Sequence, residues 1–305
     1  MHHAKNVTAE ALPKGGSRLT GQRNGFEYLF QAAAGICGLL VVGIFFFLLF
    51  FGLPLLQQGE LTTLLTTDWA PDQGLYGIRP MIKASLLLST LALGLGLPIS
   101  LGLACAITSL APPRLRQVLL YMVRLMTSIP TVVYSFAALF LLVPLMRWLL
   151  ANGGLSLLTA APVLALLITP TITLFLVNSF FRVPRSTVLA ADALGASSAQ
   201  KLLLVILPAS LPGLINGSLL GFGRALGDTM VSLMLAGNSV APNADPTAPA
   251  RTLTAHIALV MAADFDSLEF KSIFVCGLVL YTITALLTAG LRLAAGTGDN
   301  HANPS

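Results

Sequence analysis

Charged residues are scarce in this sequence. Lys, Arg, Asp and Glu make up 10% of the 305 residues, whereas hydrophobic residues make up 55%. Soluble globular domains carry about 25% charged residues, so this chain has too few charges to cover a surface that faces water. The mean hydropathy of +0.84 agrees. These values exclude the soluble classes, and we predict an all-α polytopic membrane protein in contact with lipid.

Motifs for catalysis and cofactor binding are also missing. The sequence has no HExxH zinc motif, no GxSxG nucleophile elbow and no phosphate loop ending in Gly-Lys-Ser/Thr. Its three cysteines, Cys37, Cys105 and Cys276, lack CxxC spacing, and we interpret them as small apolar packing residues. No basic run with interleaved aromatic residues indicates nucleic acid. We therefore predict no cofactor, no metal, no nucleic-acid partner and no enzymatic activity.

Long apolar runs, in contrast, are abundant. A membrane-spanning helix needs about 20 mostly apolar residues, and six segments satisfy this requirement. They are Ile36–Leu56, Met81–Leu110, Val118–Leu149, Leu155–Phe180, Val205–Ala236 and Ile273–Ala294. Internal prolines interrupt the third, fourth and fifth of these segments and leave their ends open. We predict six transmembrane helices.

Lys and Arg gather in alternate connections between these spans. They lie in the head of the chain, in the loops after the second and fourth spans, and in the tail, whereas most acidic residues lie on the other side. Short basic loops stay cytoplasmic, so both termini are predicted to be cytoplasmic, in a plasma (inner) membrane. The first apolar run is longer than the core of a cleavable signal peptide and is interpreted as a true span.

One apolar segment, "GFGRALGDTMVSLMLAGN", carries both signs of charge. Arg224 and Asp228 are four residues apart, so we predict that they share one helix face. A charge at mid-bilayer costs roughly 2.5 to 3.5 kcal/mol. The pair either packs one span against a neighbour or lines a pathway in which Arg224 meets an anion with its planar fork of donors. Intramembrane charges face a cavity or the bundle interior, which favours the pathway.

The loop after the fourth span combines helix-capping residues with a glycine. Ser186 is predicted to cap a short helix, Gly195 to end that helix, and Ser197 or Ser198 to cap a second helix that enters the membrane. The result would be a compact projection below the bilayer. Its apolar side chains either meet a partner or lie on the lipid surface, and composition favours neither.

This loop resembles the cytoplasmic signature of the permease subunits of ABC importers, which reads Glu-Ala-Ala, three residues, Gly, nine residues, Ile-x-Leu-Pro. The matching positions are Leu189, Ala190, Ala191, Gly195, Leu207 and Pro208. Leu189 replaces the signature Glu, which as third residue after Ser186 would complete a capping box. The resemblance implies that the loop docks on an ATPase subunit.

Three further segments resemble the phosphate-specific permeases of these importers. They are "IPTVVYSFAALFLLVP", "GRALGDTMVSLMLAGN" and "RTLTAHIALVMAADF", and the likeness runs over about residues 77–291. Thr131, Ser135 and Asp228 depart from the family pattern, which has Ser, Gly and Glu there. The resemblance implies a type I ABC-importer permease fold and the translocation of inorganic phosphate, with separate ATPase subunits, a second related permease and an external solute-binding protein as partners.

This interpretation divides the chain into four segments. They are a disordered cytoplasmic N-terminus (1–24), the first transmembrane helix with an external loop (25–80), the permease core (81–294) with its coupling loop (182–204), and a cytoplasmic tail (295–305). Alternatives remain open. The substrate could be another oxyanion such as molybdate, sulfate or a phosphonate. A proton-coupled secondary transporter could use the Arg-Asp pair, and a scaffolding membrane protein would not need it.

Overall fold

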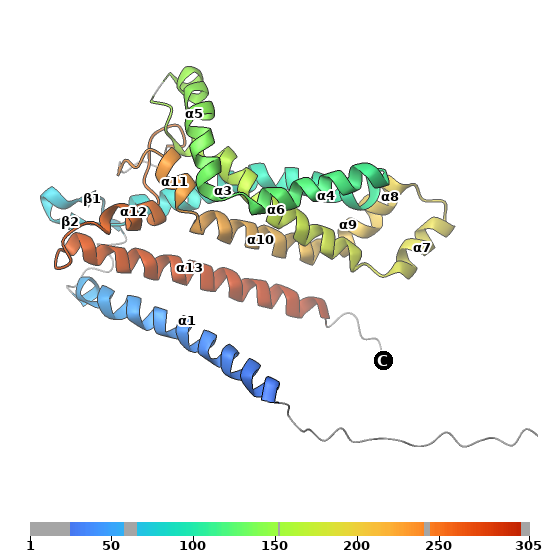
Figure 1. The fold of residues 1–305 in the computed structure, drawn as a ribbon, viewed down its shortest axis with the longest axis horizontal. Coiled ribbons are helices and arrows are strands. Elements are labelled where there is room, and N and C mark those ends of the chain that lie inside the picture. The colour runs from blue at the N-terminus through green and yellow to red at the C-terminus, as the bar shows by residue number, and fades with distance from the viewer. Residues whose placement is uncertain (1–24, 58–65, 152, 241–244, 300–305) are drawn as a thin grey trace, which may run out of the picture. The chain divides into compact units, whose positions relative to one another are not determined.

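The computed structural model describes residues 25–57, 66–151, 153–240 and 245–299, and these are helical apart from one short hairpin and the connecting loops (Figure 1). The chain divides into two compact units, residues 1–44 and 45–305, and each is described by itself. In the first unit, helix α1 (Gly25–Gln57) begins, and its side chains from residue 27 to 44 are exposed. The N-terminus predicted to be disordered, residues 1–24, lies outside the described residues.

The prediction of a multi-span helical protein is confirmed. Five described helical stretches are long and apolar enough to cross a membrane, namely Glu27–Leu53, Arg79–Leu110, Thr131–Leu150, Leu157–Phe181 and Leu268–Gly290. A sixth span arises if Ser198–Ala209 and Leu211–Gly227, which meet at a bend of 70°, are counted together.

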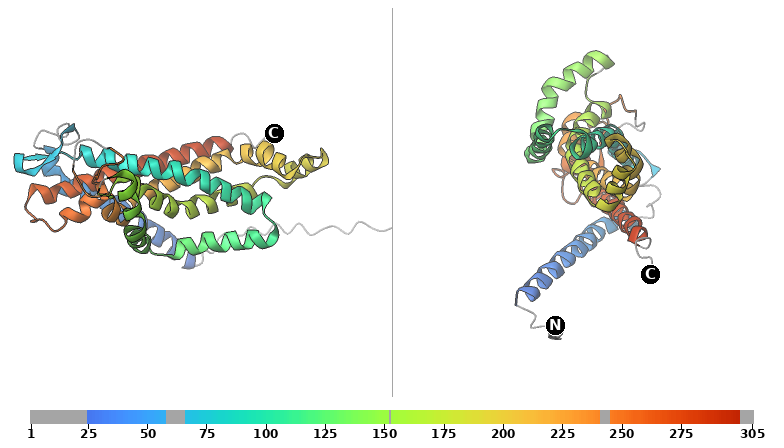
Figure 2. Two further views of the ribbon diagram at one scale, coloured as in Figure 1. Left: turned by 90° about the horizontal axis from the view of Figure 1, so that it is seen from above. Right: turned by 90° about the vertical axis from the view of Figure 1, so that its right-hand side faces the viewer.

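Most helices of the second unit belong to one bundle (Figures 1 and 2). Its long members are α3 (Arg79–Cys105), α4 (Pro113–Ser128), α5 (Thr131–Leu150), α6 (Leu157–Phe181), α10 (Leu211–Gly227) and α13 (Leu268–Asp299). The α3 helix continues as the π-helical turn η2 (Ala106–Leu110). The last helix reaches five residues into the tail predicted for 295–305, whose residues 300–305 lie outside the described part.

The predicted third span, Val118–Leu149, is wrong as a single helix. The chain breaks between α4 and α5, where Ile129 is extended at φ −80° and ψ 127° and Pro130 precedes the first residue of α5. Proline disfavours the helical conformation of the residue before it, and it lacks the amide that would continue the hydrogen-bond ladder. In Figure 1, α5 turns away from the direction of α4.

The predicted fifth span, Val205–Ala236, is also wrong as a single helix. It consists of the end of the π-helical turn η3 (Leu202–Ile206), α9 (Leu207–Ala209), α10 and α11 (Met230–Leu235), and α8 (Ser198–Lys201) precedes it. The ring of Pro208 would clash with a carbonyl one turn earlier, and a π-turn relieves that clash. Pro212 leaves a second gap in the ladder, and the 70° bend lies beside it.

The α6 helix is the centre of the bundle. It buries 72% of its most apolar stretch, whereas the other four single stretches long enough to cross a membrane bury 28% or less. Its fully buried Leu164, Ile168, Ile172 and Leu176 belong to the main hydrophobic cluster, together with residues of α3 and α10. Because α6 is largely buried, it provides the surface on which the neighbouring helices are positioned.

A second, smaller cluster surrounds the hairpin of β1 (Trp69–Ala70) and β2 (Leu75–Tyr76), which are joined by the turn η1 (Pro71–Gln73). Trp69 packs edge-on against His256 of α12 (Leu253–Val260), with ring centroids 4.5 Å apart. Next to the hairpin, Arg79 pairs with Asp68 at 2.7 Å. These contacts fix the hairpin to α12 and to the start of α3, at the opposite end of the bundle from α7 and α8 (Figure 1).

Candidate functional site

A stripe of glycines on α10 lets that helix approach α6 closely. Gly213, Gly217 and Gly221 recur every four residues and so lie on one helix face. A Cβ atom at Gly221 would come within 2.5 Å of Cδ1 of Ile172, which is closer than a methyl group can approach. Such small residues allow spanning helices to pack backbone to backbone.

Arg224 follows this stripe by less than one turn, and it reaches across to α6. Its Nη1 donates to the hydroxyl of Thr171 at 2.7 Å. The side chain is exposed in the isolated chain. Within the described residues the ion pairs are Arg79–Asp68 and Lys201–Asp192, so Arg224 has no carboxylate within 4.0 Å. A guanidinium that is anchored at one edge keeps its other donors for an anion.

Asp228 does not share a helix face with Arg224, which corrects the prediction from their spacing. The α10 helix ends at Gly227, and Asp228 has extended backbone angles, φ −75° and ψ 124°. Its Oδ1 accepts from the amide of Val231 at 2.8 Å, and its carbonyl accepts from Ser232 and Thr254 at 3.0 Å each. The carboxylate caps the first turn of α11 and holds the break between the two helices.

The coupling-loop segment forms a helix, a turn and a second helix at one end of the bundle, shown in yellow in Figure 2. Helix α7 spans Arg185–Ala193, and Gly195 follows its last turn with φ +75°. Ser197 caps α8, where it and Gln200 form a reciprocal capping box. Lys201 pairs with Asp192 at 2.6 Å and ties α8 back to α7. The predicted positions of Gly195 and Ser197 are therefore confirmed.

The start of α7 differs from the prediction. Pro184, not Ser186, is the capping residue, and no side chain caps the helix. Proline fixes the backbone angle that begins a helix, so the start moves two residues upstream of the predicted cap. Ser186 is the second helical residue, and Leu189 the fifth, too far along for a capping box. Replacement of the signature Glu by Leu189 therefore removes no cap in this chain.

The remaining signature residues lie on α7 and α9. Ala190 and Ala191 lie on α7, where Ala191 is buried and Ala190 exposed, and Leu207 and Pro208 form α9. Leu189 and Leu194 are 56% and 88% exposed, which leaves a bare apolar surface on the projecting helix. Two such side chains on a short polar projection would gain stability if a partner covered them.

Two features of the site escaped the sequence prediction. The four-residue spacing of Gly213, Gly217 and Gly221 is visible in the sequence and indicates a close helix contact. The segment Gly227-Asp228-Thr229 precedes an apolar run, and Asp in that position is a typical helix cap. Thr171, in contrast, carries no sequence signal for its contact with Arg224. Among the described residues no group of His, Cys, Asp and Glu is arranged to hold a metal ion.

The fold is that of ABC-importer permeases. It matches a structure of the MetNI methionine ABC transporter in an inward facing conformation, over 72% of this chain and 94% of that chain, with a TM-score of 0.55 and 21% identity. It also matches a bacterial ABC transporter involved in the import of the acidic polysaccharide alginate, over 92% and 100% of the chains, with a TM-score of 0.55 and 15% identity.

Residues 96–293 match the family described as binding-protein-dependent transport system inner membrane component, and the chain belongs to this family. Among curated relatives, it is 32% identical to the phosphate transport system permease protein PstC of Pasteurella multocida, over 74% of this chain and 77% of that protein. It is 28% identical to PstC of Xylella fastidiosa, over 88% and 89%. It is also 32% identical to the probable ABC transporter permease protein YqgH of Bacillus subtilis, over 75% of each chain.

The chain is therefore a multi-pass, non-catalytic membrane subunit of an ABC importer. The resemblance found in the sequence is confirmed at this level, and so is the prediction that the chain is a transport subunit.

Proposed function

We propose that this chain forms part of the pathway through which an ABC importer moves inorganic phosphate across the plasma (inner) membrane. The observation that carries the proposal is the guanidinium of Arg224, which bonds to Thr171 and has no carboxylate within 4.0 Å among the described residues. Phosphate presents several oxygens to such a planar fork of donors. The names of the PstC relatives support phosphate as the substrate.

Arg224 meets the passing anion, and Asp228 shapes the pathway by ending α10 beside it. A conducting site must bind its ion weakly enough to release it. A single guanidinium with one hydrogen bond to Thr171 meets that need better than a cluster of cations would. The break at Asp228 also places irregular backbone at membrane depth, which is tolerated where it lines a cavity or is buried in protein.

ATP hydrolysis takes place on separate ATPase subunits, which dock on α7 and α8. The exposed Leu189 and Leu194 supply the apolar contact, and Gly195 and Ser197 set the angle between the two helices. A second, related permease completes the pore, and an external solute-binding protein delivers the anion on the side of the β1–β2 hairpin. Both termini are cytoplasmic in this arrangement.

Uptake of radiolabelled phosphate into proteoliposomes that hold the assembled importer tests the substrate and the role of Arg224 together. Arg224→Met should abolish uptake, and Arg224→Lys should impair it, because an ammonium lacks the planar fork. Asp228→Glu, which restores the family residue, should transport. Uptake at the normal rate by a well-assembled Arg224→Met/Asp228→Leu variant would show that the two residues contribute only to packing.

Competition separates phosphate from other oxyanions. Unlabelled phosphate should suppress the uptake of the label, whereas molybdate, sulfate and phosphonates at the same concentration should not. Strong competition by one of them would reassign the substrate without changing the role of the chain. Thiol labelling of single cysteines at positions 185 and 247 in intact cells tests the orientation, and only position 247 should react before permeabilisation.

A further inference from the structure

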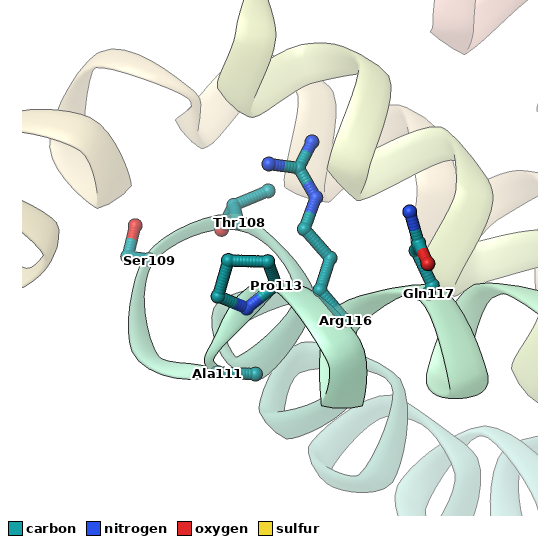
Figure 3. Close-up of a pocket in the computed structure, with 6 residues that line it drawn as sticks. All are labelled: Thr108, Ser109, Ala111, Pro113, Arg116 and Gln117. Carbon is teal, nitrogen blue, oxygen red and sulfur yellow. The ribbon is translucent and has the colours of Figure 1, made fainter.

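A cavity of about 390 Å³ opens at the end of the bundle that carries α7 and α8 (Figure 3). It lies where α3 ends in the η2 turn and α4 begins. The lining residues are Thr108, Ser109, Ala111, Pro113, Arg116 and Gln117. Its volume falls within the range of about 300–1,000 Å³ that is typical of ligand pockets. None of the pathway residues contributes to it.

The lining of this cavity is rich in hydrogen-bond donors and contains no carboxylate. Arg116 makes no side-chain hydrogen bond or ion pair with the described residues, and its guanidinium lies 5.2 Å from the ring centroid of Phe181. Gln117 and Ser109 likewise offer free donors. Figure 3 shows the Arg116 side chain rising from α4 beside Thr108. The hydroxyl of Thr108 donates its proton to the carbonyl of Ala104 at 2.8 Å, so it is not a free donor.

The backbone adds to this positive character. The α4 helix runs for 16 residues from Pro113, and Pro112 provides no side-chain cap. Pro113 has no amide hydrogen, and the amide of Arg116 bonds to the carbonyl of Pro112. The positive end of the helix dipole therefore lies near the cavity, where the first amides of a helix lack partners one turn earlier. Arg116 is the fourth residue of α4, so its guanidinium and the positive end of the helix dipole act on the same end of the helix.

A second cavity, of about 240 Å³, shares Thr108 and Ser109 with the first and continues to α7, α8 and η3. It is lined there by Val188, Ser198, Lys201 and Ile206. The Lys201 ammonium is held by Asp192, so Arg116 is the cation that remains for a ligand. An occupant of the first cavity would touch the same two residues that border the coupling loop.

We propose that the cavity at Arg116 binds the phosphoryl group of an anionic ligand, separately from the translocation pathway. A tetrahedral oxyanion can accept from the Arg116 guanidinium, from the Gln117 side-chain amide and from the Ser109 hydroxyl at the same time. Phe181 follows Thr171 by ten residues on α6, so the cavity lies about 15 Å along the helix axis from the Arg224 contact. The exposed Phe181, whose ring centroid lies 5.2 Å from the Arg116 guanidinium, gives the site an apolar border.

The same chemistry has two sources, the phosphodiester headgroup of an anionic lipid and free phosphate. The apolar border suits acyl chains, and basic pockets between spanning helices bind anionic headgroups. Free phosphate needs only the polar lining. The proposal does not depend on which substrate the importer moves, because the cavity and Arg224 lie on different helices.

Four variants of the full chain, each in the assembled importer, test the site. Arg116→Gln removes the charge, and Arg114→Gln removes a neighbouring charge on α4 that does not line the cavity. Gln117→Glu and Gln117→Lys place opposite charges at one exposed position of the lining, so this pair gives an answer even if Arg116→Gln does not assemble. Arg116→Gln and Gln117→Glu should weaken binding about tenfold, Gln117→Lys should strengthen it, and Arg114→Gln should leave it unchanged.

Two arms distinguish the sources. In the first, native mass spectrometry counts the phosphatidylglycerol retained after purification from mixed phosphatidylcholine and phosphatidylglycerol membranes. In the second, equilibrium dialysis measures binding of labelled inorganic phosphate in pure phosphatidylcholine nanodiscs, in an Arg224→Met background that removes the pathway site. If the amount of retained phosphatidylglycerol changes with the charges at positions 116 and 117, the ligand is a lipid headgroup. If the binding of inorganic phosphate changes with these charges, the ligand is free phosphate. No response in either arm, or an equal loss with Arg114→Gln, would overturn the proposal.

Discussion

The guanidinium of Arg224 on α10 donates to the hydroxyl of Thr171 on α6 over 2.7 Å. This contact joins two helices whose separation is set by the glycine stripe, so the position of the charge is fixed by backbone packing. An arginine with several free rotamers would meet an anion in many geometries. The hydroxyl selects one of them, and among the described residues no carboxylate lies within 4.0 Å of the guanidinium.

Removal of that hydroxyl should reduce phosphate uptake. A hydrogen bond to a charged group contributes about 1.5–3 kcal/mol, so we expect Thr171→Val to lower the uptake rate by about tenfold, whereas Thr171→Ser keeps it. Thr282 serves as a matched control, because its hydroxyl bonds only to the carbonyl of Leu278 on its own helix. Equal uptake by Thr171→Val and Thr282→Val would show that Thr171 does not orient Arg224.

The glycine stripe predicts a position-dependent response to one added methyl group. Gly221→Ala would place its Cβ 2.5 Å from Ile172, whereas Gly223→Ala meets nothing within 4 Å. Overpacking of a tight contact costs about 1–3 kcal/mol. Thermal denaturation in detergent, followed by size-exclusion chromatography, should show a lower midpoint for Gly221→Ala and an unchanged or higher one for Gly223→Ala. A reversed order would contradict the packing of α10 on α6.

Sequence alone predicted the class, the long spans and the turn of the coupling loop, because these depend on local chemistry. Apolar runs define spans, Gly195 suits a left-handed turn, and Ser197 suits a helix cap. Pro130 was recognised as an interruption, but a full break was not predicted there, since proline permits either a kink or a break, and the break at Asp228 was missed. The outcome depends on whether neighbouring helices satisfy the freed backbone groups.

The prediction that Arg224 and Asp228 share a helix face failed because a helix break between them was missed. Spacing of four residues implies a shared face only if the helix continues, and the helix ends between the two residues. Nothing local to Thr171 marks it as the partner of Arg224, because that contact depends on the packing of α10 against α6. The site therefore required the tertiary structure, whereas its glycine stripe was readable in advance.

Asp228 should act through its cap more than through its charge. Asn can accept from the amide of Val231 in the same way, so Asp228→Asn should fold and transport at close to the normal rate. Asp228→Ala leaves the amide unpaired and should cost about 0.5–2 kcal/mol of stability. Parallel measurements of uptake and thermal midpoint separate the two roles. A well-folded Asp228→Asn protein without uptake would instead assign a function to the carboxylate charge.

His256 should make the stability of the chain fall in acid. The ring is buried against Trp69, its Nε2 lies 3.1 Å from Ser272 Oγ, and that hydroxyl donates to the carbonyl of Glu269. Burial, together with the nearby Arg251, lowers the pKa of His256 from 6.5 to about 4. The unfolded chain binds the proton first, so this contribution is complete above pH 6.5 and is lost as the pH falls toward 4.

The size of this effect is on the order of 3 kcal/mol, at about 1.36 kcal/mol per pKa unit. His256→Gln keeps a donor for Ser272 and cannot titrate in this range. Its thermal midpoint should therefore change less than that of the unmodified protein between pH 7 and pH 5. Identical pH profiles for the two proteins would show that His256 is not the titrating group.

Gly195 provides the sharpest test of coupling, because its φ of +75° is unfavourable for other residues although its surroundings are open. Asn adopts this conformation more readily than a β-branched residue. Gly195→Asn should therefore keep the turn between α7 and α8, whereas Gly195→Val should disturb it at a cost of about 1–2 kcal/mol. Neither change creates a cavity in the bundle, so both proteins should insert and assemble.

We expect Gly195→Val to lose substrate-stimulated ATPase activity in the reconstituted importer and Gly195→Asn to retain most of it. Full stimulation in both variants would mean that the angle between these helices does not couple substrate to ATP hydrolysis. In that case α7 and α8 dock on the ATPase without acting as a coupling element.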